Sequence, residues 1–210
     1  MGQHCSSMLQ PGSGECDPLV FKQSLAWLIG LFFSCLTALA DDMLLIDDFK
    51  ESGGMSQLRT PWRLVTDGVM GGVSAGKMSQ EQIDGRRALC MRGQVSLDNN
   101  GGFIQIALDL DPLEYLDASG YTGIRVIVRG NGESYGLHLK TSDIGLPWQS
   151  YRSTFEAGPA WREIQLPFQN FEPHRINVPL DTARLSRLGL VAIGRAFTAD
   201  LCVAQIGLYL

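Results

Sequence analysis

Apolar and polar side chains alternate through most of the chain between residues 44 and 209, and this period of two limits the fold more than any other feature. Ile104, Ile106, Leu108 and Leu110, for example, occupy every second position of one segment. Such alternation predicts a β-strand with one face on a core and one face toward solvent. About ten strands are predicted in this way, at residues 44–49, 62–66, 88–95, 104–110, 124–129, 135–140, 151–155, 163–168, 188–193 and 201–209.

Turn-forming residues separate these segments. Gly accounts for 24 of the 210 residues, about 11% against a usual value of about 7%. Gly, Asn and Pro gather between segments at residues 99–102, 130–133 and 157–159. Long amphipathic helices are not indicated, and one helical turn is expected within residues 179–187, with Asp181 as its N-cap. The sequence predicts an all-β sandwich or barrel that forms a single domain over residues 41–210.

Residues 1–40 have the character of an export leader. The stretch 23–40 is uncharged, follows Lys22 and ends in Ala38-Leu39-Ala40, with the small residues that signal peptidase accepts. We predict a signal peptide with an extended N-terminal region, cleaved after Ala40, and translation from Val20 would give a more compact leader. The protein is then exported and periplasmic. The alternative is an uncleaved leader that anchors the protein and makes its only membrane contact.

Charge and residue usage exclude several functional classes. The net charge of −5 argues against nucleic-acid binding, which needs clustered Lys and Arg. His138 and His174 are the histidines beyond the leader, and neither has a Cys or His at metal-ligand spacing. Two histidines are a thin supply for a serine triad, and nothing in the sequence places an acid opposite a base. We therefore expect no enzymatic activity, no metal and no cofactor.

Cys90 and Cys202 remain after the leader, and two cysteines in an exported chain are able to pair. Strand alternation argues against pairing, because Cys202 shares a face with Ala204 and Ile206 that we interpret as inward. Cys90 shares a face with Arg92 that we interpret as outward. The sequence leaves the disulfide open.

The densest local signal lies at residues 62–74, where a predicted strand ends at Asp67-Gly68 and a Gly71-Gly72 turn follows. Asp67 and Ser74 are expected to accept hydrogen bonds from backbone N–H groups there. The loop is either a tight structural turn or a surface that faces a ligand or partner. In a second acidic pair, Asp47 and Asp48, alternation places one carboxylate inward or at a sheet edge, in a hydrogen-bonding role.

A second cluster runs from Asp98 through Asn99 and Asn100 into Gly101-Gly102-Phe103. Calcium binding is one interpretation, but only Asp98 brings a charge and the D-x-D-x-D spacing is absent. We expect a hairpin turn instead. The candidate partner- or ligand-binding residues are therefore those of both loops: Asp67, Met70, Gly71, Gly72, Ser74, Asn99, Asn100, Gly101, Gly102 and Phe103.

Several segments in the same order carry a family resemblance. The sequences W-R-L-V-T-D-G-V-M-G-G-V-S at 62–74 and N-N-G-G-F at 99–103 resemble the complex I intermediate-associated protein 30 family. Y-G-L at 135–137, W-R-E-I-Q-L-P-F at 161–168 and P-L-D at 179–181 extend the resemblance over residues 45–210. It implies a galactose-binding-like jelly-roll β-sandwich and no catalytic residues.

The family resemblance also suggests a role. The namesake eukaryotic members are assembly factors for mitochondrial complex I, but an export leader is at odds with that location. Our first hypothesis is therefore an exported, non-catalytic module that binds a protein partner or assists assembly, with an exposed apolar patch beside the two loops.

A carbohydrate-binding module is the alternative. It predicts a concave face with exposed aromatic side chains, Trp148 and Tyr151 first, whereas Trp62 and Trp161 are also candidates for the core. A hydrolytic or redox enzyme is a third hypothesis, and it needs a pocket with convergent titratable groups.

Overall fold

The computed structural model describes residues 43–210, and the predicted signal peptide, residues 1–40, lies outside them. The described residues form twelve β-strands and four short 3-10 helices. The strands are β1 (Met43–Asp47), β2 (Arg63–Thr66), β3 (Ala75–Ile83), β4 (Arg86–Val95), β5 (Phe103–Asp109), β6 (Gly123–Gly130), β7 (Glu133–Thr141), β8 (Ser150–Ala157), β9 (Arg162–Pro167), β10 (Glu172–His174), β11 (Leu185–Ile193) and β12 (Phe197–Tyr209). The helices are η1 (Asp67–Met70), η2 (Asp98–Asn100), η3 (Phe168–Asn170) and η4 (Thr182–Arg184).

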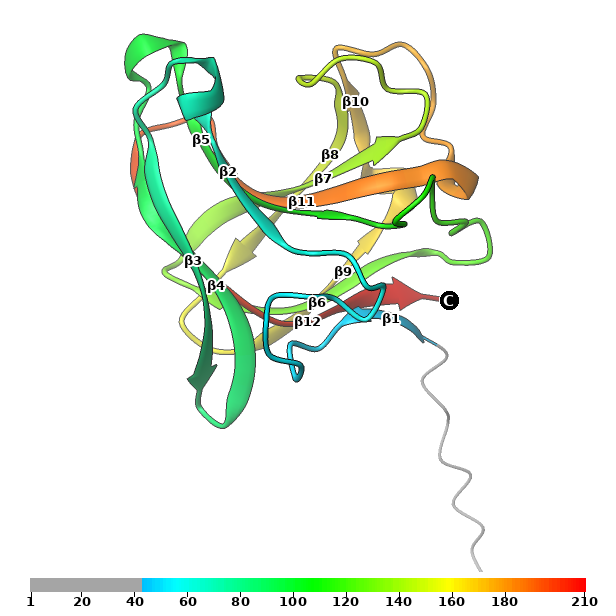
Figure 1. Ribbon diagram of the computed structural model, residues 1–210, viewed down its shortest axis with the longest axis horizontal. Helices are drawn as coiled ribbons and strands as arrows, with labels where there is room; N and C mark the ends of the chain where they lie inside the picture. Colours follow the sequence, from blue (N-terminus) through cyan, green and yellow to red (C-terminus); the bar gives the residue numbers. More distant parts are fainter. Residues whose placement is uncertain (1–42) are drawn as a thin grey trace, which may run out of the picture. The chain divides into compact units, whose positions relative to one another are not determined.

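Two antiparallel sheets of six strands each form the two layers of Figure 1. The first sheet has the order β3-β4-β12-β6-β9, and β1 also pairs with β12. The second sheet has the order β10-β8-β7-β11-β5-β2. Strand β12 is long enough to pair with β4 along its first half and with β1 along its second half. The predicted all-β sandwich is confirmed.

The core lies between the sheets and is filled by the alternate positions that the sequence predicted. Ile104, Ile106 and Leu108 of β5 are fully buried, and so are Ile124 and Val126 of β6 in the other sheet. They belong to one apolar cluster that draws on both sheets. Burial of each such side chain contributes about 1.5–3 kcal/mol, so the apolar faces are what hold the layers together.

Two strands were not predicted, and both are sheet edges. In β3 most side chains are polar and partly or fully exposed, because the strand pairs only with β4. Strand β10 is three residues long and contains Pro173, a residue that edge strands tolerate. An edge strand at the rim of a sandwich buries few side chains, so the apolar periodicity that reveals central strands is weak there.

Asp47 confirms the expectation of one inward carboxylate in the second acidic pair. It is buried, accepts a hydrogen bond from Trp62 Nε1 at 2.8 Å and accepts another from Phe49 N at 2.9 Å. Burial raises the pKa of the Asp47 carboxyl, although both hydrogen bonds oppose that rise. The contact ties the end of β1 to the start of β2, so Trp62 is a core residue.

Cys90 and Cys202 form a disulfide, which the strand alternation had argued against. The reason is a bulge in β12, where the register shifts between Val203 and Gln205. The bulge reverses the alternation, so that Val203 and Ile206 both face the core while Cys202 faces outward. Cys202 then lies directly opposite Cys90 on β4, on the same outer face of the first sheet.

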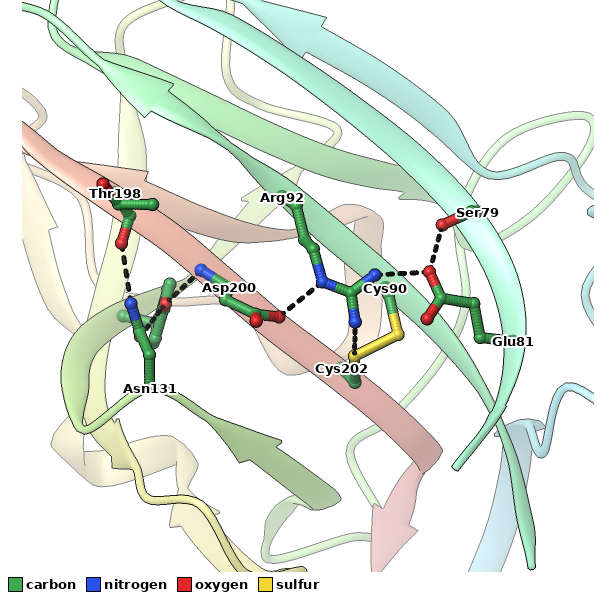
Figure 2. Close-up of polar contacts among 9 residues, drawn as sticks. Ser79, Glu81, Cys90, Arg92, Asn131, Thr198, Asp200 and Cys202 are labelled. Atoms are coloured by element: carbon green, nitrogen blue, oxygen red, sulfur yellow. Dashed lines mark hydrogen bonds and ion pairs between the residues drawn. A yellow bond between two sulfur atoms is a disulfide. The ribbon is translucent and has the colours of Figure 1, made fainter. Parts of the chain in front are cut away.

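Arg92 covers the disulfide from the outer side of the first sheet (Figure 2). Its guanidinium donates to Asp200 Oδ1 at 2.9 Å, to Cys202 Sγ at 3.5 Å and to Glu81 Oε1. Hydrogen bonding from Arg92 lowers the pKa of Glu81. Because the cation and both carboxylates are paired, this cluster is a structural clamp across β3, β4 and β12.

The helical turn predicted within residues 179–187 is confirmed as η4. Asp181 is its N-cap, and its side chain accepts a hydrogen bond from Ala183 N at 3.0 Å. Within residues 43–210, no helix has the length and hydrophobicity that a membrane span requires.

The disulfide is expected to stabilise the sandwich. It links positions 112 residues apart. Loss of a disulfide that closes so long a loop lowers the free energy of unfolding by about 2–5 kcal/mol, because the unfolded chain gains entropy. The Cys90→Ala/Cys202→Ala variant should lose that much free energy of unfolding in urea titrations. Reduced native protein is the control and should fall to a similar value, whereas a variant as stable as the oxidised protein would contradict the prediction.

Candidate functional site

Two loops meet at one end of the sandwich, because each of them crosses from one sheet to the other. Residues 67–74 connect β2 in the second sheet to β3 in the first, and residues 96–102 connect β4 in the first sheet to β5 in the second. Thr66 is opposite Ile104 and Ala75 is opposite Gln94 in the two ladders. These pairings place η1 and η2 side by side, at the upper left of Figure 1.

The second loop is therefore not the hairpin that the sequence predicted. Strands β4 and β5 are consecutive, but they belong to different sheets and do not pair. Asn99 and Asn100 have φ values of 54° and 57°, in the left-handed region that Asn tolerates better than most residues. These residues turn the chain from one layer to the other, and Asn-Gly sequences serve that purpose as well as they serve a two-residue hairpin.

Asp67 joins the two loops and has no exposed surface (0%). One carboxylate oxygen accepts a hydrogen bond from Ser74 N at 2.9 Å. The other accepts from Gly102 N at 2.6 Å, from Phe103 N at 3.3 Å and from the Ser74 hydroxyl. The expectation that Asp67 binds backbone N–H groups is confirmed, and the bonds reach both loops.

The hydrogen bonds to Asp67 keep it ionised inside the protein. Burial alone would raise its pKa, but the bonds from Ser74, Gly102 and Phe103 outweigh burial and lower the pKa below its ordinary value. Gly72 and Gly101 pass so close that a Cβ on either would overlap the carboxylate. Both glycines are thus needed for the close approach of backbone to Asp67.

Ser74 makes further contacts besides those with Asp67. It is buried, and its hydroxyl oxygen accepts a hydrogen bond from Ser96 N at 3.0 Å. Asp67, Gly72, Ser74, Gly101 and Gly102 therefore form an internal frame, while Gly71 ends η1 with a φ of 87°. These members of the predicted site shape the loops from within.

Four apolar side chains of the two loops are exposed, beside the exposed polar residues 98–100. Val69 is 73% exposed, Met70 60%, Val73 51% and Leu97 52%. Of these four residues only Met70 was singled out from the sequence. We call them the loop patch. The signal that could have revealed it is the run V-M-G-G-V, which places apolar residues in a turn where no strand alternation explains them.

The aromatic residues proposed for sugar binding are not gathered on one face. Trp148 is 48% exposed, but Tyr151 is 1% exposed, and its hydroxyl lies 3.0 Å from the carbonyl oxygens of Val178 and Pro179. Trp161 packs beside the disulfide with the Arg129 guanidinium 5.8 Å from its ring. The expected pair of Trp148 and Tyr151 therefore does not form a stacking platform.

A separate hollow of about 350 Å³ opens on the outer face of the second sheet. Its lining comes from β7, β8 and the end of β11: Ser134, Tyr135, Gly136, His138, Arg152, Thr154, Ile193, Gly194 and Arg195. Burial, together with the charges of Arg152, His174 and Lys140, lowers the pKa of His138 to about 3. The imidazole is therefore neutral at physiological pH. No cluster of potential metal ligands is present in the described part of the chain.

The architecture and the loops define a class: an antiparallel β-sandwich whose sheet-to-sheet connections present apolar side chains at one end. A sequence profile of the complex I intermediate-associated protein 30 (CIA30) family matches residues 48–203. The chain belongs to this family, which confirms the resemblance found in the sequence.

Solved structures with a similar fold include carbohydrate-binding modules. A family 11 module from Clostridium thermocellum, in complex with a β-1,3-1,4-mixed-linked tetrasaccharide, has a TM-score of 0.61 at 14% identity over 80% of this chain and 95% of that chain. A family 30 module has a TM-score of 0.57 at 13% identity over 80% of this chain and 89% of that chain. At such identities the likeness shows the fold alone. No curated protein matches the chain in sequence.

Asp67→Asn should destabilise the protein by about 2–4 kcal/mol, because an amide accepts with only one oxygen and turns N–H donors toward other donors. Asp98→Asn in the adjacent helix η2 is the matched control, since Asp98 is exposed, and it should change the free energy of unfolding by less than about 0.5 kcal/mol. Urea titrations compare the two variants. Equal effects would show that Asp67 is not the structural centre of the loops.

His138 should make the protein less stable as the pH falls. Its folded pKa of about 3 lies below the ordinary value of 6.5, so between these values the unfolded chain binds a proton that the folded chain does not. The contribution of His138 to the free energy of unfolding is complete above pH 6.5 and declines as the pH falls below that value. His138→Gln should therefore lose less free energy of unfolding than the native protein between pH 7 and pH 5, and a parallel decline would contradict the assignment.

Proposed function

We propose that this chain is an exported, non-catalytic binding module that holds a protein partner on the loop patch and assists its assembly. The observation that carries the proposal is the patch itself, four large apolar side chains exposed on two adjoining loops. Isolated exposed apolar residues are ordinary, but a group at one end of a domain is typical of an interaction surface.

The frame beneath the patch favours binding. Asp67 fixes the two loops to each other through hydrogen bonds to Ser74, Gly102 and Phe103. A surface that is already ordered loses little conformational entropy when a partner docks, so more of the contact energy appears as affinity. A rigid apolar surface suits a protein partner better than a soluble sugar, whose hydroxyl groups need polar contacts.

The family and the cysteines support the rest of the proposal. The family is named for association with an assembly intermediate of complex I, which is a protein partner. The Cys90–Cys202 disulfide suits an oxidising compartment such as the periplasm, as does the leader at residues 1–40. We therefore infer a partner among exported proteins, and contact with a membrane only through an uncleaved leader.

The carbohydrate-binding alternative rests on the likeness to modules such as the family 11 module bound to a tetrasaccharide. The feature expected for it was a face with Trp148 and Tyr151 exposed together, and Tyr151 is buried. Protein binding at the loop patch is therefore the proposal that the contacts favour.

Val69→Asp and Met70→Glu should abolish partner capture, because each buries a charge in an apolar contact. The measurement is recovery of crosslinked partners by the mature protein from a periplasmic extract, with recovery expected to fall at least about tenfold. Leu113→Asp is the matched control, since Leu113 is 90% exposed and lies outside the loop patch. Thermal unfolding should be unchanged in all three variants.

Two results would overturn the proposal. One is capture of the same partner by Met70→Glu and by the native protein. The other is a glycan array that gives a clean hit while no protein is recovered, which would make the protein a carbohydrate-binding module.

A further inference from the structure

We propose that the hollow on the outer face of the second sheet is a separate site for an acidic glycan, whose carboxylate or sulfate group is bound by Arg152 and His138. This site lies on β7, β8 and β11, apart from the loop patch, and does not depend on protein binding there. Three features of the hollow support this proposal. Arg152 has no carboxylate partner, His138 has no hydrogen-bond partner within the described residues, and glycines in the lining leave room for a ligand.

The positive charge gathers around Arg152. This side chain donates from Nε to Ser150 Oγ at 2.9 Å, and within residues 43–210 it forms no ion pair with a carboxylate. Burial lowers the pKa values of Arg152 and His174, and the nearby charge of Arg175 lowers both further. Glu172 faces Arg152 across the β8–β10 ladder but is exposed and does not pair with it.

Three other arginines on this side of the protein are paired. Arg187 and Arg63 both bind Asp109, and Arg195 binds Glu133 and stacks 4.0 Å from the Phe197 ring. Arg152 and Arg175 have no such carboxylate partner within residues 43–210. Their mutual repulsion would be relieved by an oxyanion, which the Arg152 guanidinium is able to bind through two N–H groups at once.

His138 supplies the second polar contact. Its imidazole lies over Gly136, where a Cβ would come within 2.9 Å of Nε2. The ring is largely buried and neutral, and no hydrogen bond to it is present within the described residues. A neutral imidazole offers one donor and one acceptor. It is therefore suited to a ligand that presents both an acidic oxygen and a hydroxyl group, as acidic sugars do.

The shape of the hollow favours a sugar over an acidic peptide. Gly136 and Gly194 are part of the lining and carry no side chain that would fill the hollow, and Ile193 offers an apolar surface for the C–H face of a sugar ring. The hydroxyls of Ser134 and Thr154 are available to ring hydroxyls. The site lies on the face of a sheet, so a peptide would not find the free strand edge that main-chain recognition uses.

The test is titration of the mature protein with oligogalacturonate, a probe that carries one carboxylate per sugar, and with the matched neutral oligogalactose. Calorimetry should show binding of the acidic probe that is at least about tenfold tighter than binding of the neutral one. Histidine side-chain NMR signals should shift on binding, with His138 affected first. Sulfated oligosaccharides test whether sulfate replaces carboxylate.

Arg152→Gln should weaken oligogalacturonate binding about tenfold to a hundredfold, which corresponds to the loss of one charge-assisted contact. Arg162→Gln is the matched control, because Arg162 is an exposed arginine of β9 in the other sheet. Both variants should keep the native unfolding temperature, and Met70→Glu should bind the glycan normally. If Arg152→Gln fails to fold, His138→Gln replaces it and should weaken binding in the same direction.

Several outcomes would overturn the acidic-glycan site: no binding of oligogalacturonate at millimolar concentration, equal binding of the neutral probe, or equal loss in Arg162→Gln. Binding of polyglutamate as tight as that of oligogalacturonate would show that the hollow recognises negative charge alone, and would also overturn it. None of these results bears on the loop patch, whose variants are scored separately.

Discussion

Burial of one apolar face from each sheet is the constraint on which the rest of the structure depends. Central strands such as β5 and β6 place every second side chain in the shared core, which leaves the other side chains outside. The chain has to change sheets to complete both layers, because β2 and β5 are in one sheet while β3 and β4 are in the other. Each crossing leaves the ladders, and its backbone groups then need partners from elsewhere.

Asp67 meets that need at the crossings of β2 to β3 and of β4 to β5. A single ionised carboxylate accepts bonds from residues on both connections, so two loops far apart in sequence behave as one unit. N–H groups of both loops are therefore used internally, and the apolar side chains around Met70 are left outside. The same interaction thus explains why the loops are ordered while Met70 and its apolar neighbours stay exposed.

Most of the fold could be predicted because central strands carry a period of two that a single sequence displays. The edge strands β3 and β10 were missed, since exposed positions carry no such pattern. The disulfide was misjudged because one bulge between Val203 and Gln205 reverses the alternation of β12. The outward residues Cys202 and Ala204 are themselves small and apolar, so the sequence pattern does not reveal where the alternation changes. In the loops, Asp67 and the glycines were recognised, but which side chains remain outside depends on contacts between segments that are about 35 residues apart.

The loop patch and the hollow differ in a way that follows from their positions. The two crossing connections turn N–H and hydroxyl groups inward to Asp67 and carry four exposed apolar side chains outside, which suits a protein. A sheet has its backbone groups paired in the ladder, so its outer face is free to carry charged side chains such as Arg152 beside His138. Binding at the loop patch gains affinity from the desolvation of apolar surface. Binding at the hollow gains affinity from charge and weakens as salt is added. Raising the ionic strength should therefore separate the two activities within one protein, because glycan binding at the hollow declines while partner binding at the loop patch persists.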